Sequence, residues 1–436
     1  MKELIKKNGI KYFIYITLAL LYLTAVCFSH PQELASGLRS IILSRDALIT
    51  DYFELVGYGP AFFNAALVMT ISLVMIEYAE LPFTGLTVAA IFINTGFGFW
   101  GKNIVNIIPI HFGTILYAKA HHTPMSRYTY TALFATCLAP FVTELTYILP
   151  FGLWGNLGIA ILAGLFVGYV LPPLSQHTAS MHMGYSLFNV GFSGGTLAFV
   201  LFCVLKSFGI SSEPVFIWKA QQHHGLITGI YIYLLLAFLL GLYMNGWKFK
   251  NLWKLFKHPG RAVADFVLMD GPGVTLMNMS LTAVAALSYA MLIDADFSGP
   301  VLGCLFTVFG FAAFGAHLRN YIPVLLGVYL STFFSQYAPN DAGMLIAAFF
   351  VVGIAPIAGQ FGPIWGVIAG MLHSCIVMCT SAMYGGLNLY NNGFSCGWVA
   401  IVMLPIIESF MRGYQIRKQI HKQRKEAKKE NKGNDS

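Results

Sequence analysis

Apolar segments recur along the chain about every thirty residues and are separated by short polar stretches. A helix needs ~20 apolar residues to cross the hydrocarbon core of a membrane. By this measure we predict an all-α integral membrane protein with seven membrane segments in each half. In the first half they lie near residues 11–29, 60–80, 83–100, 103–119, 128–149, 156–173 and 193–209. In the second half they lie near residues 226–245, 274–294, 297–314, 319–337, 342–358, 362–379 and 396–411.

The two halves are copies of each other. Residues 51–116 align without a gap on residues 265–330, a shift of 214 positions, with 17 identities in 66 positions. Six glycines, two asparagines and one proline are among the identities. A biased apolar composition would match leucine with leucine but would not keep these residues in register. We therefore predict a first repeat at residues 1–215, a second repeat at residues 216–411 and a basic cytoplasmic tail at residues 412–436.

An odd number of segments in each repeat would place the two copies in opposite orientations across the membrane. The loops after the first segment of each repeat carry different charge. Residues 30–50 hold two basic and two acidic residues, whereas Trp247–Arg261 holds five basic residues and no acidic one. We therefore expect inverted-topology repeats with broken or re-entrant helices, and both termini in the cytoplasm of a bacterium. If segment 103–119 or 193–209 is re-entrant, the two halves become parallel.

Composition and charge narrow the class of protein further. Hydrophobic residues make up 57% of the chain and charged residues 10%, against about 25% in soluble proteins. The net charge of +8 comes largely from clusters near both ends, which indicate contact with anionic lipid rather than with nucleic acid. The seven cysteines form neither a disulfide framework nor a zinc-binding pattern. We expect no metal and no cofactor; the partners are the lipid bilayer and a small-molecule or ion substrate, and a homo-oligomer stays open.

The motif NxGFSxG occurs once in each repeat, at Asn189–Gly195 and at Asn391–Gly397, before the last segment. Its glycines permit an unwound chain, and Asn189, Ser193, Asn391 and Ser395 offer neutral oxygens and amides. A loop dipping toward the middle of the membrane would present these groups to an ion or substrate. The alternative is an ordinary loop whose Asn or Ser caps the next helix.

Four amides also repeat in apolar surroundings, namely Asn64, Asn106, Asn278 and Asn320. They could contact a ligand or could make hydrogen bonds between helices, which are common in membranes. Lys102 lies four residues before Asn106 and could meet an anionic substrate. We expect instead that its ammonium group extends to the membrane interface.

Glu144 is the most isolated acidic residue within a predicted segment, and Gln360 is its counterpart in the second repeat. A lone carboxylate is costly inside a membrane and therefore indicates a function. Glu144 could bind a proton or Na⁺, with Gln360 as its uncharged equivalent. The alternative places Glu144 near the outer interface without a role.

Paired prolines inside the apolar segments, Pro109 with Pro323 and Pro140 with Pro356, indicate helices broken at matching positions. With its duplicated GFS and NxxP motifs, the chain resembles a family of bacterial multi-pass membrane proteins defined only as a duplicated domain of unknown function. The resemblance covers nearly the whole sequence and implies no substrate, mechanism or site residue.

Broken helices at matching positions of two repeats are typical of secondary transporters. Our leading hypothesis is a transporter of a small polar or anionic solute, with one site between the repeats and with protons or sodium as candidate coupling ions. One alternative is an ion or solute channel. Another is a membrane enzyme that uses His177 and His182 with Ser175, Ser180 or Ser186, although we expect the protein not to be an enzyme.

Overall fold

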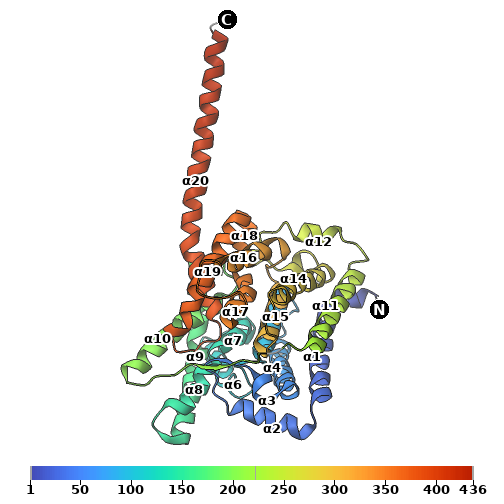
Figure 1. The fold of residues 1–436 in the computed structure, drawn as a ribbon, viewed down its shortest axis with the longest axis vertical. Coiled ribbons are helices and arrows are strands. Elements are labelled where there is room, and N and C mark those ends of the chain that lie inside the picture. The colour runs from blue at the N-terminus through green and yellow to red at the C-terminus, as the bar shows by residue number, and fades with distance from the viewer. Residues whose placement is uncertain (1, 221, 435–436) are drawn as a thin grey trace.

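The computed structural model describes residues 2–220 and 222–434, and it is almost entirely helical (Figure 1). The helices of the first repeat are α1 (Lys2–Phe28), α2 (Pro31–Ile42), α3 (Tyr52–Val56), α4 (Tyr58–Tyr78), α5 (Gly85–Phe97), α6 (Ile108–Ala120), η1 (Met125–Arg127), α7 (Thr129–Ala135), η2 (Thr136–Leu138), α8 (Ala139–Ile148), α9 (Gly152–Met181) and α10 (Asn189–Ser207). Two three-residue strands that we did not predict, β1 (Leu48–Thr50) and β2 (Val215–Ile217), pair in parallel.

The second repeat holds the same succession of helices except for η1. These are α11 (His224–Met244), α12 (Lys250–Leu255), α13 (Phe266–Met269), α14 (Pro272–Leu292), α15 (Gly299–Phe311), α16 (Leu318–Ser331), α17 (Ala342–Phe350), η3 (Val351–Ile354), α18 (Ala355–Phe361), α19 (Pro363–Met383) and α20 (Asn391–Asn434). The side chains of the basic tail beyond residue 413 lie outside the described part of the chain.

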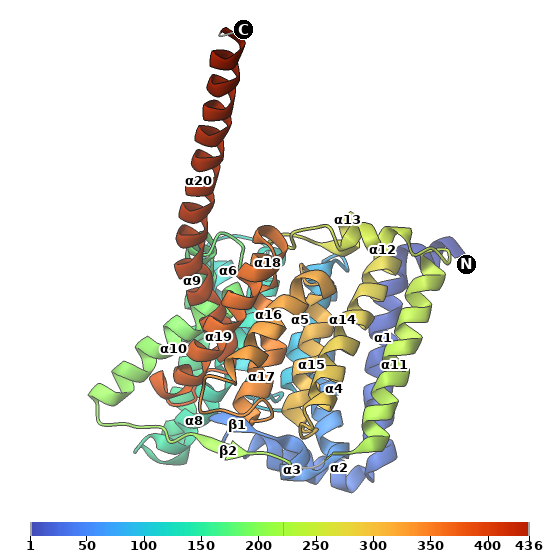
Figure 2. The same cartoon turned by 45° about the horizontal axis from the view of Figure 1, so that its top comes forward.

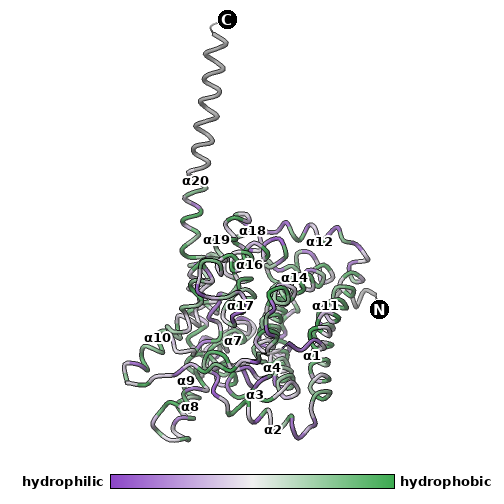
Figure 3. The backbone as a smooth tube through the Cα atoms, viewed as in Figure 1, coloured by the Kyte–Doolittle hydropathy of each residue, from purple (hydrophilic) through white to green (hydrophobic). Residues whose placement is uncertain are grey.

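Ten helical segments in the described residues are long and apolar enough to cross a membrane. They are α1, α4, α7–α8, α9 and α10, and their counterparts α11, α14, α17–α18, α19 and α20. Large apolar side chains lie exposed along α1 and α11 at the edge of the bundle, where Figure 3 also shows hydrophobic residues along both helices. Because lipid accepts such a surface and water does not, the protein is a multi-pass membrane protein.

Four further segments, α5, α6, α15 and α16, are shorter than predicted. They contain 13 or 14 residues, which span roughly 20 Å of the ~30 Å hydrocarbon core. Of the prolines that we expected to break helices, Pro140 and Pro356 begin α8 and α18, each after a 3₁₀ turn that interrupts the segment. The expectation was wrong for the other pair, because Pro109 lies in the first turn of α6 and Pro323 lies inside the uninterrupted α16. Broken helices are therefore present in both repeats at Pro140 and Pro356 only.

The termini define two faces of the bundle (Figure 2). Helix α1 begins and α20 leaves at one face, which also carries α12 and α13, and we call it the terminal face. The opposite face carries α2, α3, β1 and β2, and we call it the strand face.

Helices α5 and α15 lie side by side in the middle of the bundle and run in opposite directions. Gly96 of α5 faces Gly303 of α15 so closely that a Cβ on either residue would lie 2.3 Å from the carbonyl oxygen of the other. Toward the terminal face, Gly85 at the start of α5 approaches Ala313, just beyond the end of α15. The crossing therefore requires glycine in both helices.

Each repeat caps the central helix of the other. The carboxylate of Asp51 accepts the backbone N–H of Gly299 at 3.0 Å, at the start of α15. Asp265, which is 214 positions later, accepts the N–H of Gly85 at 2.9 Å, at the start of α5. Burial raises the pKa of Asp51 to about 6, whereas the N–H groups of Lys219, Phe53 and Gly299 lower it. A carboxylate at each start also compensates the positive end of the helix dipole.

The glycine crossing predicts that Gly96→Ala and Gly303→Ala each destabilise the fold. The added methyl group meets backbone rather than a flexible side chain, so we expect a loss of about 1–3 kcal/mol in the free energy of unfolding. The measurement is denaturant unfolding of the purified protein in detergent. Gly158→Ala in α9 is the control, because no atom lies within 4 Å of its added Cβ. Equal stability of the three variants would contradict the packing.

Candidate functional site

The two NxGFSxG motifs form the first turns of α10 and α20, and these two helices cross there. A Cβ on Gly191 would lie 3.0 Å from the Cα of Gly393, and the rings of Phe192 and Phe394 stack at 5.9 Å. Loops 182–188 and 384–390 lead into these helix starts from within the bundle. The motifs are thus helix starts rather than the tips of re-entrant hairpins.

Each of the two loops is held by the interrupted helix of the other repeat. The N–H of Leu187 donates to the carbonyl of Gly353 in η3 at 2.8 Å. The N–H of Leu389 donates to the carbonyl of Cys137 in η2 at 2.9 Å. The 3₁₀ breaks therefore receive donors at the point where the helical hydrogen-bond ladder stops.

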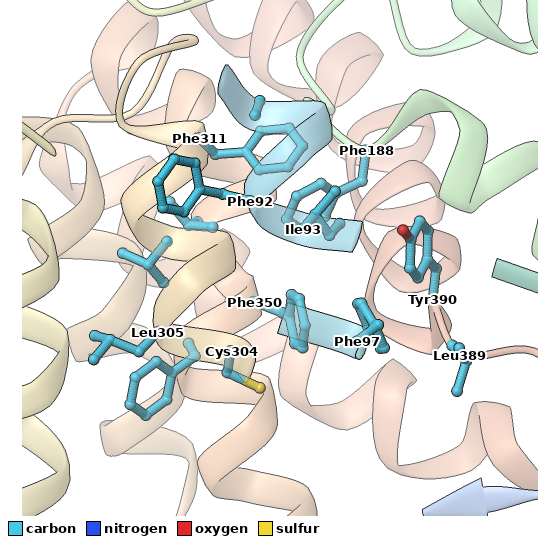
Figure 4. Close-up of a cluster of buried hydrophobic side chains, with 14 of the residues drawn as sticks. Phe92, Ile93, Phe97, Phe188, Cys304, Leu305, Phe311, Phe350, Leu389 and Tyr390 are labelled. Carbon is cyan, nitrogen blue, oxygen red and sulfur yellow. The ribbon is translucent and has the colours of Figure 1, made fainter. Parts of the chain in front are cut away.

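Six aromatic rings, which we call the aromatic plug, fill the space between these breaks. They are Phe97, Phe134 and Phe188 from the first repeat and Phe311, Phe350 and Tyr390 from the second. Ring centroids lie 4.8 Å apart for Phe97 with Tyr390, and 4.6 Å apart for the equivalent pair Phe188 and Phe311. Figure 4 shows five of the rings gathered around the ends of α5 and α15. The plug consists of three pairs of equivalent residues, one member from each repeat. The pairs are Phe97 with Phe311, Phe134 with Phe350, and Phe188 with Tyr390.

Two cavities lie on opposite sides of the plug. The terminal cavity, of about 440 Å³, has His182, Ser186 and Tyr390 in its wall, together with Val263 from the segment between α12 and α13. The strand cavity, of about 230 Å³, has Trp100 in its wall and residues of β1 and β2 at its rim. Between them lies a void of only about 10 Å³, which is at the lower limit for one water molecule. The structure is therefore closed to solutes at its centre.

Each cavity reaches the start of one NxGFSxG helix. Asn189 and Gly191 of α10 lie in the wall of the terminal cavity, and Asn391 and Asn392 of α20 lie in the wall of the strand cavity. The first N–H groups of a helix have no acceptor inside the helix and carry the positive end of its dipole. Both cavities therefore end at a place suited to negative charge.

The polar side chains of the first motif hold the loop before α10 in place. Asn189 accepts from Thr178 at 3.0 Å and from His182 Nε2 at 2.9 Å, and it donates to the carbonyl of Ser175 at 2.8 Å. Burial lowers the pKa of His182, whereas its hydrogen bond to Asn189 raises it, and the net shift is downward. The hydroxyl of Ser193 bonds carbonyls of its own helix.

The second motif is organised similarly. Asn391 accepts from the hydroxyl of Tyr384 at 2.6 Å. Ser395 donates to the carbonyl of His373 at 3.0 Å. The Asn189 and Ser193 side chains are bonded within the protein, and so are the Asn391 oxygen and the Ser395 hydroxyl, whereas the backbone N–H groups of the helix starts are available for a ligand.

Two of the repeated amides satisfy the carbonyls that the ends of α5 and α15 leave free. Asn64 donates to the carbonyls of Gly98 and Lys102 at 2.7 and 2.8 Å. Asn278 makes the same two bonds 214 positions later, also at 2.7 and 2.8 Å. The geometry matches the hydrogen bonding between membrane segments that we set beside ligand contact.

The other two amides shape the loops that follow α5 and α15. Asn106 and Asn320 each donate to the carbonyl five residues earlier, at 3.1 and 2.9 Å. Each also accepts the N–H three residues earlier, at 2.9 and 2.8 Å. None of the four amides lies in the wall of either cavity.

Lys102 lies inside the protein, and our expectation that it extends to the interface was wrong. Its side chain is fully buried, and its Nζ donates to Asn94 Oδ1 and to the hydroxyl of Tyr390, both at 2.8 Å. The turn at Gly101, where φ is +80°, brings the chain back into the bundle just before the lysine. The charge lies behind the aromatic plug, where sequence reasoning did not place it.

Glu144 has a charged partner that the sequence did not reveal. Arg45 bonds its carboxylate through Nε and Nη2, with the shortest distance 2.6 Å, and Ser212 donates to it at 3.2 Å. The carboxylate is fully buried, whereas the side chain of Arg45 is 35% exposed. Gln360 is exposed near the end of α18 and has no such partner in the described residues. Glu144 therefore takes part in an ion pair and is not isolated.

The residues of the enzyme hypothesis do not form a catalytic pair. Ser175 and Ser180 each donate to a backbone carbonyl, and Ser186 has no hydrogen-bond partner. In the described residues, neither the imidazole ring of His177 nor that of His182 makes a hydrogen bond with a serine hydroxyl, and no group of three metal-ligating side chains occurs.

The fold and the central closure define a class, namely multi-pass membrane proteins built from two repeats whose interrupted helices meet in the middle. A family model described as "Protein of unknown function (DUF1576)" matches residues 30–207 and 244–409, and the chain belongs to this family. The match in two regions confirms the resemblance inferred from the repeated motifs. No curated protein and no solved structure matches the chain.

The ion pair predicts that replacing Arg45 costs more stability than replacing Glu144. Arg45→Met leaves a buried carboxylate without its cation, so we expect it to lower the free energy of unfolding by about 3 kcal/mol. Glu144→Gln leaves an arginine that can reach solvent, so we expect about 1 kcal/mol. Denaturant unfolding in detergent measures both, and Arg39→Met, on the exposed side of α2, is the control. A larger cost for Glu144→Gln would show that Arg45 is the dependent partner.

Proposed function

We propose that the protein is a secondary transporter of a small anionic solute, and that it exposes one central site alternately to the two faces. The observation that carries this proposal is the pair of cavities on opposite sides of a closed aromatic plug, each reaching the start of an NxGFSxG helix. A carrier needs access from both sides but never a continuous path, and this arrangement suits that need.

We also propose that the two repeats are oppositely oriented in the membrane. In support, α5 and α15 run in opposite directions, and their capping carboxylates, Asp265 and Asp51, belong to opposite faces of the bundle. The basic stretch 247–261 lies at the terminal face with α12. By the positive-inside tendency the terminal face would be cytoplasmic, with both termini there.

In the proposed transport cycle, the two repeats exchange conformations. The terminal cavity is the larger one, so this structure stands closer to a state open at the terminal face. Two contacts of the plug have matching contacts between the equivalent residues. Phe97 with Phe350 matches Phe134 with Phe311, and Phe97 with Tyr390 matches Phe188 with Phe311. If the repeats exchanged conformations, the strand cavity would widen while the same six rings closed the other side.

The proposed orientation predicts opposite accessibility of two equivalent positions. Tyr78 and Leu292 end α4 and α14, 214 positions apart, and they are 83% and 84% exposed. Tyr78→Cys and Leu292→Cys are made in a chain whose other cysteines are replaced by serine. In sealed cells, a membrane-impermeant maleimide should label the second variant, and the first only after lysis. Labelling of both from the same side would rule out inverted repeats.

The plug predicts that removing its rings makes the protein leaky to ions. In proteoliposomes, uptake of a small organic anion such as benzoate should saturate, without electrical conductance above that of lipid. Phe97→Ala with Phe350→Ala removes two contacting rings and should produce a measurable leak current. Phe306→Ala, whose ring contacts Phe92 outside the plug, is the control and should not. Channel-like currents through the unaltered protein would replace the carrier with a pore.

A further inference from the structure

Four buried polar side chains form a connected group behind the aromatic plug, and we call it the lysine cluster. Its members are Asn94, Lys102, Thr136 and Tyr390. Lys102 donates to Asn94 and to Tyr390 at 2.8 Å, and Thr136 donates to Asn94 at 2.9 Å. The cluster joins α5, the loop after it, the break in α7–α8 and the loop before α20.

The group of residues related to this cluster by the repeat is entirely apolar. The residues in the positions of Asn94, Lys102, Thr136 and Tyr390 are Val308, Ala316, Val352 and Phe188, and all four are buried. Apolar residues therefore suffice to build this part of the architecture. Because burying polar groups and an ammonium is costly, the cluster requires an explanation other than folding.

The amine of Lys102 has no acidic partner in the described part of the protein. Both hydrogen-bond acceptors of its Nζ are neutral, and no carboxylate forms an ion pair with it. The faces of Phe97 and Tyr390 lie 5.3 and 4.7 Å from Nζ, which offsets only part of the desolvation. An anion from outside the protein would complete this charge balance.

Tyr390 connects the lysine to the terminal cavity, because its side chain belongs to the cavity wall. Its oxygen accepts from Lys102, so its own hydroxyl hydrogen has no acceptor among the described residues. Ser186 lies in the same wall, is 1% exposed, and its hydroxyl has no hydrogen-bond partner in the part of the chain that the structure describes. The start of α10, at Asn189 and Gly191, adds N–H groups to the same wall. Unused donors of three kinds therefore meet at this cavity.

We propose that this cavity binds a small organic monoanion with an apolar body, such as a monocarboxylate. The carboxylate takes the hydrogens of Tyr390 and Ser186 at the start of α10, and Lys102 supplies the balancing charge through Tyr390. Lys102 supplies a single positive charge, so a dianion such as phthalate would keep an unpaired charge in an apolar site. The rings of Tyr130, Phe134 and Phe314 in the wall suit an apolar body.

This assignment of substrate class rests on the proposed transport function, but binding tests it without transport. Purified protein in detergent is titrated with acetate, butyrate and benzoate, and binding is followed by calorimetry and by the shift in thermal unfolding. We expect saturable binding that strengthens from acetate to benzoate. Benzamide, which has the same shape without charge, and phthalate should bind at least about tenfold more weakly than benzoate.

Variants test whether Lys102 supplies the positive charge for benzoate binding. Lys102→Met should weaken benzoate binding about tenfold to a hundredfold and remove the preference over benzamide. Tyr390→Phe and Ser186→Ala, which keep the lysine, should each weaken benzoate binding about tenfold. Lys119→Met, an exposed lysine at the end of α6, is the control and should bind as the unaltered protein does. If Lys102→Met does not fold, Tyr390→Phe and Ser186→Ala still test the same site.

The outcomes separate the two proposals. Benzoate binding that is unchanged in Tyr390→Phe and Ser186→Ala, or equal binding of benzamide, would overturn the monoanion site whatever the protein transports. Saturable uptake of a neutral solute or a dianion that does not depend on Lys102 would overturn the site and keep the transporter. Lys102-dependent binding of benzoate without any uptake would keep the site and overturn the transporter.

Discussion

The antiparallel contact between α5 and α15 is the constraint on which the rest of the structure depends. Both helices stop before they could cross the hydrocarbon, so their ends leave backbone groups that lipid cannot satisfy. In both helices, equivalent residues of the two repeats make hydrogen bonds to these backbone groups. Asn64 and Asn278 take the free carbonyls, and the partner repeat supplies a carboxylate to each helix start. The glycine pair lets the two backbones approach closely enough for these hydrogen bonds to form.

The sequence predicted those features of the fold that depend on local apolar runs or on the internal repeat. Seven segments in each half, the breaks near Pro140 and Pro356, and the duplicated motifs follow from apolar runs and from a self-alignment, which need no three-dimensional knowledge. The lengths of α5 and α15 were overestimated because the apolar runs continue past the helix ends into buried loops, where apolar residues also pack. A hydropathy pattern cannot distinguish a buried turn from a continuing helix.

Two of the missed features depend on contacts between distant residues, and the third depends on a single turn. Glu144 looked isolated because Arg45 lies 99 positions earlier, in a loop with no periodic pattern. Parallel pairing of β1 with β2 joins three-residue segments 167 positions apart. Lys102 was assigned to the interface from its position at a segment end, and only the turn at Gly101 takes it inward. The one available signal was the repeat itself, which sets Ala316 against Lys102 and so marks a position where symmetry is broken.

The reciprocal capping by Asp51 and Asp265 has a consequence for the origin of the chain. A protein consisting of one repeat would lack the carboxylate that starts its own central helix, so it would need a second copy facing it to be complete. Fusion of the two copies fixed their ratio at one to one. After fusion, a mutation could alter one copy without altering the other, and a lysine could then arise opposite an alanine.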